Sequence, residues 1–253
     1  MKFLINRKIK DKEKFFNPKI SDFAKDLNIP GIEKAQKRIL QAIKNNELII
    51  AYGDYDVDGI CGAAVLYLGL TKMGAKVLPY IPHREKEGYG LSSAGLDFAK
   101  SSGAELIISC DTGIVAFEQA EYAKKLKIDL IITDHHQPQG TKRPDAYAIV
   151  HSLALCGTAV AWTLFQDENL LDLVALATVA DMMPLMGANR ALVKEGLKKL
   201  NLTQRVGLLA LFNEAGIKLG EIGSYEIGHI IAPRLNAMGR LEHAMDSLRL
   251  LCT

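Results

Sequence analysis

The stretch Leu48-Ile-Ile-Ala-Tyr-Gly-Asp-Tyr-Asp-Val-Asp-Gly59 decides the fold of this chain. Its apolar first half predicts a buried strand. Three aspartates, Asp54, Asp56 and Asp58, then follow at alternate positions. Alternate side chains of an extended segment point to the same side, so the three carboxylates can face one small volume. Charges held that close raise one another's pKa values, which a bound cation would relieve. Taken alone, the stretch fits a polar turn after a strand equally well.

The composition is that of an ordinary folded protein. The 253 residues are 49% hydrophobic and 24% charged, with a formal net charge of +2. That length suits one large or two small domains, and the charge does not by itself indicate a nucleic-acid partner. The four cysteines form no CxxC pair, so neither a zinc site nor a disulfide framework is indicated. The charged start of the chain and the absence of a long apolar run lead us to expect a cytoplasmic protein without membrane contact.

Apolar strands alternate with helices over the first part of the chain. Helical periodicity covers 32–45, and strands are predicted at 48–52, 76–81, 105–109, 129–133 and 146–150. Between them we expect helices at 59–73, 92–102 and 115–126. This order predicts the α/β class, with a parallel β-sheet flanked by helices and then an all-helical segment. The helices of that segment are expected at 157–165, 169–180, 190–200, 206–215, 224–231 and 242–251. We therefore divide the chain into an N-terminal arm and helix (1–45), an α/β core (46–150) and a helical part (151–253).

Acidic and histidine residues follow three of the predicted strands. One strand ends in Asp111-Thr-Gly113 and another in Asp134-His135-His136, while a helix ends at Asp181. Asp111-Thr-Gly113 or Asp181 alone would be read as a turn or a loop acid. Ligands of parallel sheets bind beyond the carboxyl ends of the strands, where these groups meet.

Together these groups predict a metal site. One of the two adjacent histidines should face the metal, and the other should orient or contact the substrate. Carboxylates with imidazoles suit manganese, and so many carboxylates suggest two ions that share an aspartate, as in two-metal phosphoester hydrolysis. The candidates are Asp54, Asp56, Asp58, Asp111, Asp134, His135, His136 and Asp181.

In order and spacing, these motifs resemble the four motifs of the DHH phosphoesterase superfamily. The motifs are Gly53-Asp-Tyr-Asp-Val-Asp-Gly59, Asp111-Thr-Gly-Ile114, Asp134-His-His136 and Ala180-Asp181. Three further stretches are similar to the RecJ family of single-strand-specific DNA exonucleases. They are Tyr80-Ile-Pro-His-Arg84 running into Glu87-Gly-Tyr-Gly-Leu-Ser92, Leu155-Cys-Gly-Thr-Ala159, and Pro233-Arg-Leu-Asn-Ala-Met-Gly-Arg240.

The resemblance implies a 5′→3′ exonuclease that hydrolyses single-stranded DNA to 5′-mononucleotides in recombination and repair. Such an enzyme depends on manganese or magnesium, here two ions, and its partners would include single-strand-binding protein and other repair proteins. Two alternatives stay open. One is another DHH phosphoesterase, acting on short oligonucleotides, cyclic dinucleotides or pyrophosphate. The other is a non-catalytic scaffold of a replication or repair complex, which the complete set of motif acids and histidines disfavours.

The resemblance also suggests a role for each residue. Six residues form the expected catalytic set: Asp56, Asp58, Asp111, His135, His136 and Asp181. Asp54 and Asp56 would hold one ion, Asp58, His135 and Asp181 the other, and Asp111 would bridge. His136 would lie at the scissile phosphate. Asp134 would be a supporting residue, and the family pattern allows the same for Asp54.

A second set of residues is expected to contact DNA. Arg84, Arg234 and Arg240 could be solvated surface charges, but guanidinium groups grip phosphate bidentately, so we assign them to the DNA backbone. Asn236 lies in the same segment as two of them and is included with them. Tyr89 could stack on a base or pack on the rim of the site.

The sequence departs from the family pattern in two places. His151-Ser152 stands where an Asn-Pro pair is common, and the loop that joins it to Gly157 is short. The chain also stops at Thr253, so the DHHA1-type and oligonucleotide-binding domains of a RecJ protein are expected to be absent. We therefore expect a fragment or an incomplete product, whose catalytic layer could bind ions yet cleave DNA poorly.

Overall fold

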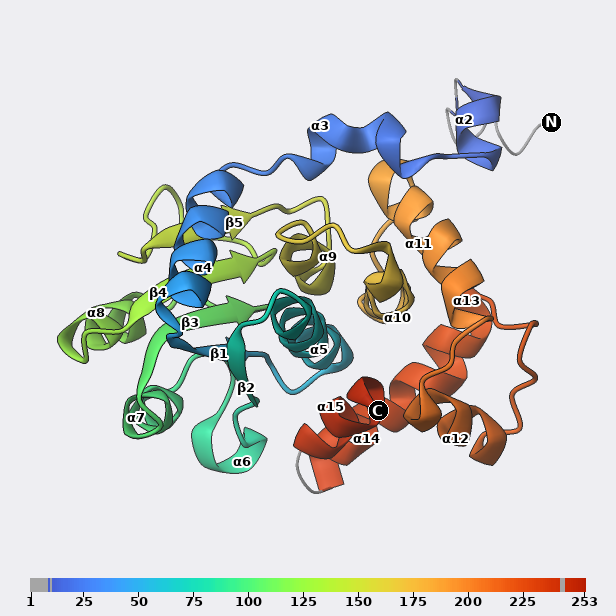
Figure 1. The fold of residues 1–253 in the computed structure, drawn as a ribbon. Coiled ribbons are helices and arrows are strands. Elements are labelled where there is room, and N and C mark those ends of the chain that lie inside the picture. The colour runs from blue at the N-terminus through green and yellow to red at the C-terminus, as the bar shows by residue number, and fades with distance from the viewer. Residues whose placement is uncertain (1–8, 10, 242–243) are drawn as a thin grey trace.

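Five parallel strands form a sheet in the order β2-β1-β3-β4-β5 (Figure 1). The strands are β1 (Leu48–Tyr52), β2 (Lys76–Tyr80), β3 (Ala104–Cys110), β4 (Asp129–Asp134) and β5 (Ala148–His151). In register, Tyr52 lies opposite Ser109, and Cys110 lies opposite Thr133. The residues that follow β1, β3 and β4 therefore emerge at one edge of the sheet. The predicted α/β class and parallel sheet are confirmed.

The structure is a computed structural model that describes residues 9, 11–241 and 244–253, with the backbone alone at 240 and 241. The helices up to β4 are α2 (Lys12–Phe16), a 3-10 helix (Ile20–Phe23), α3 (Ala24–Leu27), α4 (Ile32–Asn45), α5 (Val57–Lys72), α6 (Arg84–Glu87), α7 (Ser93–Ser101) and α8 (Phe117–Lys125). The later ones are α9 (Gly157–Trp162), a 3-10 turn (Glu168–Leu170), α10 (Leu171–Ala180), α11 (Gly187–Leu200), α12 (Val206–Glu214), α13 (Ser224–Glu226), a π-helical turn (Ile227–Ile231), α14 (Ala232–Leu241) and α15 (Met245–Cys252). The long helices lie where they were predicted, within a few residues. The short helices α2, α3 and α6, and helix α14, were not predicted.

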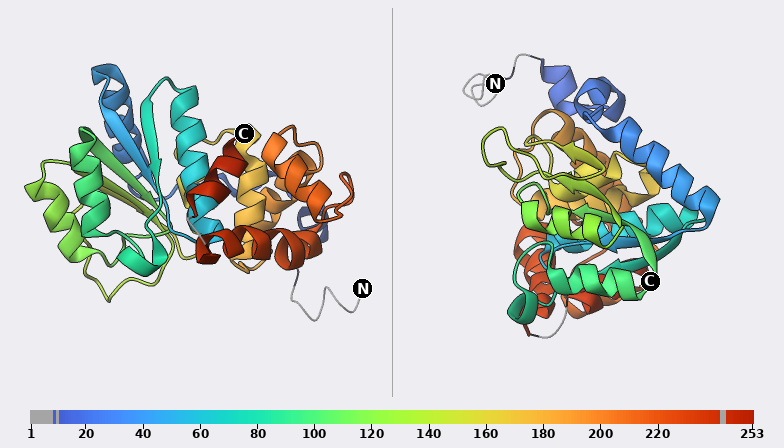
Figure 2. Two further views of the ribbon diagram at one scale, coloured as in Figure 1. Left: turned by 90° about the horizontal axis from the view of Figure 1, so that it is seen from below. Right: turned by 90° about the vertical axis from the view of Figure 1, so that its left-hand side faces the viewer.

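Two apolar layers sandwich the sheet (Figure 2). Ile50 and Tyr52 of β1 pack with α7 and α8 on one face, whereas Ile49 and Ala51 pack with α4, α5 and α9 on the other. This division follows from the alternation of side chains along a strand. Every strand residue of β1 after Leu48 is buried, as expected for a parallel sheet covered on both faces.

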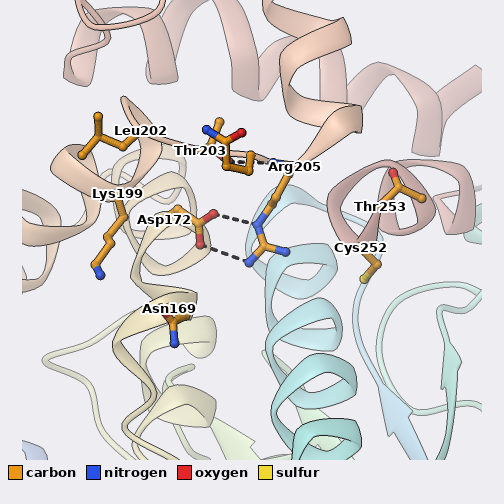
Figure 3. Close-up of a pocket in the computed structure, with 9 residues that line it drawn as sticks. Asn169, Asp172, Lys199, Leu202, Thr203, Arg205, Cys252 and Thr253 are labelled. Atoms are coloured by element: carbon orange, nitrogen blue, oxygen red, sulfur yellow. Dashed lines mark hydrogen bonds and ion pairs between the residues drawn. The ribbon is translucent and has the colours of Figure 1, made fainter.

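The helices after β5 lie on the side of the sheet that α5 covers (Figures 1 and 2). Helix α10 packs against α5, α9 and α11. Near its start, Asp172 accepts hydrogen bonds from Arg205 at 2.7 and 3.3 Å (Figure 3). Arg205 also donates to the carbonyl of Leu251 in α15. This ion pair joins α10 to α12 and α15. It lies at a pocket of about 360 Å³ that none of the predicted site residues lines.

A single run of helix spans α13, the π-helical turn and α14. The sequence predicted an end near residue 231 because Pro233 follows. Instead, the N–H of Ala232 donates to the carbonyl of Ile227, five residues earlier. Such a widened turn re-routes the backbone hydrogen bonds next to a residue that lacks an N–H, so the helix continues through Pro233.

None of the helices in the described part of the chain combines the length and the apolar character needed to cross a membrane. The division into three parts at residues 45 and 150 stays a prediction.

Candidate metal centre

The carboxyl ends of the strands bring the predicted acids and histidines together. Within each of three groups, one candidate ligand atom per side chain lies within 4.8 Å of the others. The groups are Asp54, Asp56 and Asp111; Asp58, His135 and Asp181; and Asp111, His135 and His136. Asp111 and His135 each belong to two groups, so the three form one continuous cluster.

Asp54 is the innermost carboxylate of the cluster. It lies two residues beyond β1 and is fully buried. Neither of its oxygens has a hydrogen-bond partner of regular geometry among the described residues. Burial, followed by the negative charge of Asp56, raises its pKa to about 7. The backbone N–H groups of Tyr55 and Gly90 offset this rise only in part. A buried carboxylate stabilised so little by its neighbours is a ready cation ligand, because an isolated buried charge is costly.

Helix α5 places the next two acids. Asp56 is its N-cap, with Oδ1 accepting from the N–H of Gly59 at 3.0 Å, and its side chain is exposed. The pKa of Asp56 is still raised, because protein around it displaces water and Asp58 is negatively charged. Asp58 lies in the first turn and is buried. Its two oxygens accept from the backbone N–H groups of Gly157 and Thr158 at 2.6 and 2.7 Å, which fixes the carboxylate.

Asp111 lies at the centre of the cluster in a left-handed backbone conformation, with φ of 61°. This conformation is uncommon outside glycine, although aspartate tolerates it better than most residues. Gly157 packs so close that an added Cβ would lie 2.6 Å from the Cβ of Asp111. Burial, together with the charges of the neighbouring aspartates, raises the pKa of Asp111 well above its ordinary value. The backbone conformation of Asp111 and its close packing against Gly157 thus hold this carboxylate near the other negatively charged groups.

The two histidines face different parts of the site. Nε2 of His135 lies 3.0 Å from Oδ1 of Asp111 and 3.6 Å from Oδ2 of Asp58, and its Nδ1 lies 3.8 Å from Asp181. Burial and the charge of Asp58 raise the pKa of Asp181 to about 6. His135 thus points into the acidic cluster.

His136 is held from one side by Asp134 and from the other by Tyr89. Oδ1 of Asp134 lies 2.8 Å from Nδ1 of His136 and accepts from the backbone N–H of His135 and His136 as well, while Oδ2 accepts from the N–H of Ile114. Although burial pushes the pKa of Asp134 up, these hydrogen bonds outweigh it and lower that pKa. The bond to Asp134 also raises the pKa of His136. Nε2 of His136 meets the hydroxyl of Tyr89 at 2.9 Å.

The residues predicted to contact DNA are more dispersed. Arg84 is exposed on the rim, with its guanidinium 5.1 Å from the ring centre of Tyr55. Tyr89 is 52% exposed and lies edge-on to Tyr55. Arg234 is exposed and donates to the carbonyl of Ile230. The side-chain oxygen of Asn236 accepts from the backbone N–H of Val57. The side chain of Arg240 lies outside the described residues.

Sequence reasoning singled out the stretch Leu155–Ala159 and His151 but did not give them their role of supporting the cluster. The backbone N–H groups of Gly157 and Thr158 hold Asp58, and no side-chain pattern reveals a backbone donor. The departure at His151 does carry a signal, because its Nε2 lies 2.7 Å from the carbonyl of His136 and donates to it. This contact fixes the backbone that follows the two histidines.

The part of the chain that contains the cluster matches a known protein family. The model of the DHH family, N-terminal domain, matches residues 48–183 of the 253, which is more than half of the chain. The chain belongs to the DHH family. The matched region contains every candidate ligand of the cluster, from Asp54 to Asp181.

Among curated DHH relatives, the chain is similar to the single-stranded-DNA-specific exonuclease RecJ of Bacillus subtilis, with 41% identity over 94% of this chain and 32% of that protein. A crystal structure of exonuclease RecJ bound to manganese matches with a TM-score of 0.82 and 34% identity, over 88% of this chain and 61% of the other. RecJ of Thermus thermophilus in complex with Mn2+ also matches with a TM-score of 0.82, at 31% identity, over 99% of this chain and 38% of the other. The resemblance to RecJ is confirmed, and the chain spans about a third of the length of the Bacillus relative.

Proposed function

We propose that this chain is the catalytic part of a metal-dependent exonuclease that hydrolyses single-stranded DNA in the 5′→3′ direction to 5′-mononucleotides. The observation that carries the proposal is the pair of adjacent ligand groups at the strand ends, Asp54–Asp56–Asp111 and Asp58–His135–Asp181. The 3.0 Å contact between Asp111 and His135 joins the two groups. Similarity to RecJ over 94% of the chain supports the choice of substrate.

The residues of the cluster fit two divalent cations. Asp54 and Asp56 would hold one ion, Asp58, His135 and Asp181 the other, and Asp111 would lie between them. The fit rests on chemistry visible in the structure: Asp54 is buried with no hydrogen bond of regular geometry to its oxygens among the described residues. Burial and neighbouring negative charges raise the pKa values of Asp54, Asp111 and Asp181, a cost that divalent cations would relieve. Oxygen ligands suit manganese and magnesium alike, and the imidazole of His135 favours manganese.

When bound, the two ions lower the pKa of a water and polarise the phosphoryl oxygens. The protein's part is to hold its groups in place beforehand. Gly157 and Thr158 fix Asp58, so its carboxylate needs little reorganisation. Asp134 binds Nδ1 of His136 and favours the protonated ring, held at Nε2 by the Tyr89 hydroxyl, and the positive charge of that ring can offset charge on a nearby phosphate.

We assign the rim of the site to DNA. Arg84 and Arg234 would grip backbone phosphates, because both guanidinium groups are exposed. Arg240 keeps the same predicted role. Asn236 would use its side-chain amide N–H groups, since its oxygen already accepts from Val57. The exposed ring of Tyr89 would stack on a base. The cellular setting we propose is recombination and repair in the cytoplasm, with single-strand-binding protein among the partners.

The test is the manganese-dependent release of mononucleotides from single-stranded DNA labelled at the 5′ end. Duplex DNA, a 3′-labelled strand and a dinucleotide serve as the comparison substrates. Rapid release of the 5′ label from the single strand, with manganese but not with a chelator, is the expected result. Cleavage of the dinucleotide alone would show a phosphoesterase for short substrates. Failure to bind manganese would exclude the catalytic interpretation and leave a scaffold.

A further inference from the structure

Helix α14 contacts the backbone on both sides of Asp56, in the segment Asp54–Asp58 that we call the acidic loop. On one side, Oδ1 of Asn236 accepts from the backbone N–H of Val57 at 3.0 Å. On the other, Gly239 lies so close that an added Cβ would be 2.8 Å from the carbonyl oxygen of Tyr55. Asn236 and Gly239 are three residues apart and therefore lie on the same face of the helix. The backbone groups that they contact belong to the two neighbours of Asp56.

The contact at Val57 completes the start of helix α5. The first N–H groups of a helix have no partner inside it and need one from elsewhere. Asp56 supplies an oxygen to Gly59, and Asn236 supplies one to Val57 from a position 179 residues further along the chain. The N–H of Val57 is thus satisfied by Asn236, while a carboxylate oxygen of Asp56 lies within 4.8 Å of a ligand oxygen of Asp54 and of Asp111.

Helix α14 is itself firmly placed. Leu235 is buried in the core, and its carbonyl accepts from the hydroxyl of Ser247 in α15 at 3.0 Å. Since Leu235 precedes Asn236 directly, the C-terminal helices set the position of the side chain that holds Val57. Any displacement of α14 would be passed to the backbone around Asp56.

We propose that Asn236 and Gly239 are positioning residues for the metal centre, which fix the backbone on either side of Asp56 and so set the affinity of the site for its cations. The inference rests on the proposed metal centre. It gives Asn236 a role that does not need DNA, in addition to any contact its amide N–H groups make with a phosphate.

The test compares manganese affinity in the absence of DNA, by calorimetric titration, across matched variants. Asn236→Ala should weaken manganese binding about 2- to 13-fold, the range expected for one half-buried hydrogen bond of about 0.5–1.5 kcal/mol. Asn236→Asp keeps an acceptor oxygen and adds a negative charge near the cations, so its affinity should be no weaker than that of the unaltered chain. Asn201→Ala removes a comparable half-buried hydrogen bond, from the backbone N–H of Ile222 to Oδ1 of Asn201 at 2.8 Å, away from the metal centre, and should leave affinity unchanged.

Substitutions at Gly239 and Gly228 provide a second pair of variants. Gly239→Ala should weaken manganese binding at least as much as Asn236→Ala, because the added methyl meets the carbonyl of Tyr55. Gly228→Ala is the control in the same run of helix, since an added Cβ there lies 4.0 Å from its nearest neighbour. Hydrogen exchange at the amide of Val57 should accelerate in Asn236→Ala and not in Asn201→Ala.

The outcomes separate this inference from the proposed function. If the unaltered chain binds manganese and both Asn236→Ala and Gly239→Ala bind it equally well, the positioning role is wrong. Loss of affinity in Asn236→Asp as well would also contradict it, because the acceptor oxygen is retained. If the unaltered chain binds no manganese, the metal centre itself is wrong.

Discussion

The two ends of helix α10 each present an aspartate, and the protein treats them in opposite ways. Asp172, in the first turn, is buried and paired with Arg205, and a negative charge is favourable there. Asp181 follows the last turn, where a negative charge is unfavourable, and it faces Asp58 and His135. Among the described residues no lysine or arginine pairs with Asp181. Asp172, with an internal cation partner, stabilises the fold, whereas Asp181, in a group of acids without a lysine or arginine partner among the described residues, is a ligand that we propose for an external cation.

The largest effect is expected from Asp111, whose loss should abolish activity without unfolding the protein. Asp111→Ala should lower the rate of DNA hydrolysis by about 10³-fold or more, because a shared ligand contributes several kcal/mol to metal-ion catalysis. The fold should persist, since relief of repulsion in the metal-free cluster offsets the cost, about 1–2 kcal/mol, of an alanine in the left-handed conformation of Asp111. Kinetics on single-stranded DNA and thermal unfolding in chelator check both points. A variant that cleaves at a near-unaltered rate would contradict the role of Asp111.

A change at Asp172, in the first turn of α10, should instead lower stability and leave manganese binding unaltered. Asp172→Asn leaves the guanidinium of Arg205 without its counter-charge, and should lower the free energy of unfolding by about 3 kcal/mol. Manganese affinity should stay the same. The matched control is Asp246→Asn, which breaks the exposed pair with Arg249 and should change stability by no more than about 0.5 kcal/mol. Equal effects of the two variants on stability, measured by denaturant unfolding, would remove the distinction between the ends of α10.

The free energy of unfolding of the metal-free protein should fall with rising pH, whereas the stabilisation by manganese should grow with rising pH. In the metal-free protein, the carboxyls of Asp54 and Asp181 have pKa values of about 7 and about 6, against an ordinary 3.8, so the folded state binds protons more tightly than the unfolded chain. The free energy of unfolding should therefore fall as the pH rises from about 4 to about 7. The metal-free protein should melt at a higher temperature at about pH 6 than at about pH 8. Manganese should raise that temperature more at about pH 8, and a larger rise at about pH 6 would refute the assignment.

The smallest effect should come from the rim. Tyr89→Phe removes the hydroxyl that meets Nε2 of His136 and keeps the ring, so kcat should fall about fivefold, as for one hydrogen bond, with KM little changed. Tyr89→Ala should raise KM as well, since a stacked base is worth about 1–3 kcal/mol. Steady-state kinetics on single-stranded DNA distinguishes the two. An unchanged KM in Tyr89→Ala would leave the tyrosine as a rim residue only.

The sequence predicted the sheet and the meeting of its strand ends because both depend on local patterns. Apolar runs such as 48–52 give the strands, and parallel order alone brings Asp54, Asp111 and Asp134 to one edge. Helix α14 was missed because Pro233 reads locally as a helix breaker, and only the widened turn before it shows otherwise. The support of Val57 by Asn236 could not be predicted either, because it joins segments 179 residues apart through a backbone donor.

The most direct test of the metal centre is a calorimetric titration of the metal-free chain with manganese at about pH 8, where the raised carboxyls of Asp54 and Asp181 are mostly ionised. The expected result is two ions per chain, with binding lost or greatly weakened in Asp111→Ala and retained in Asp172→Asn. A chain that binds no manganese, or binds it equally well without Asp111, would contradict the assignment of this cluster as a metal centre.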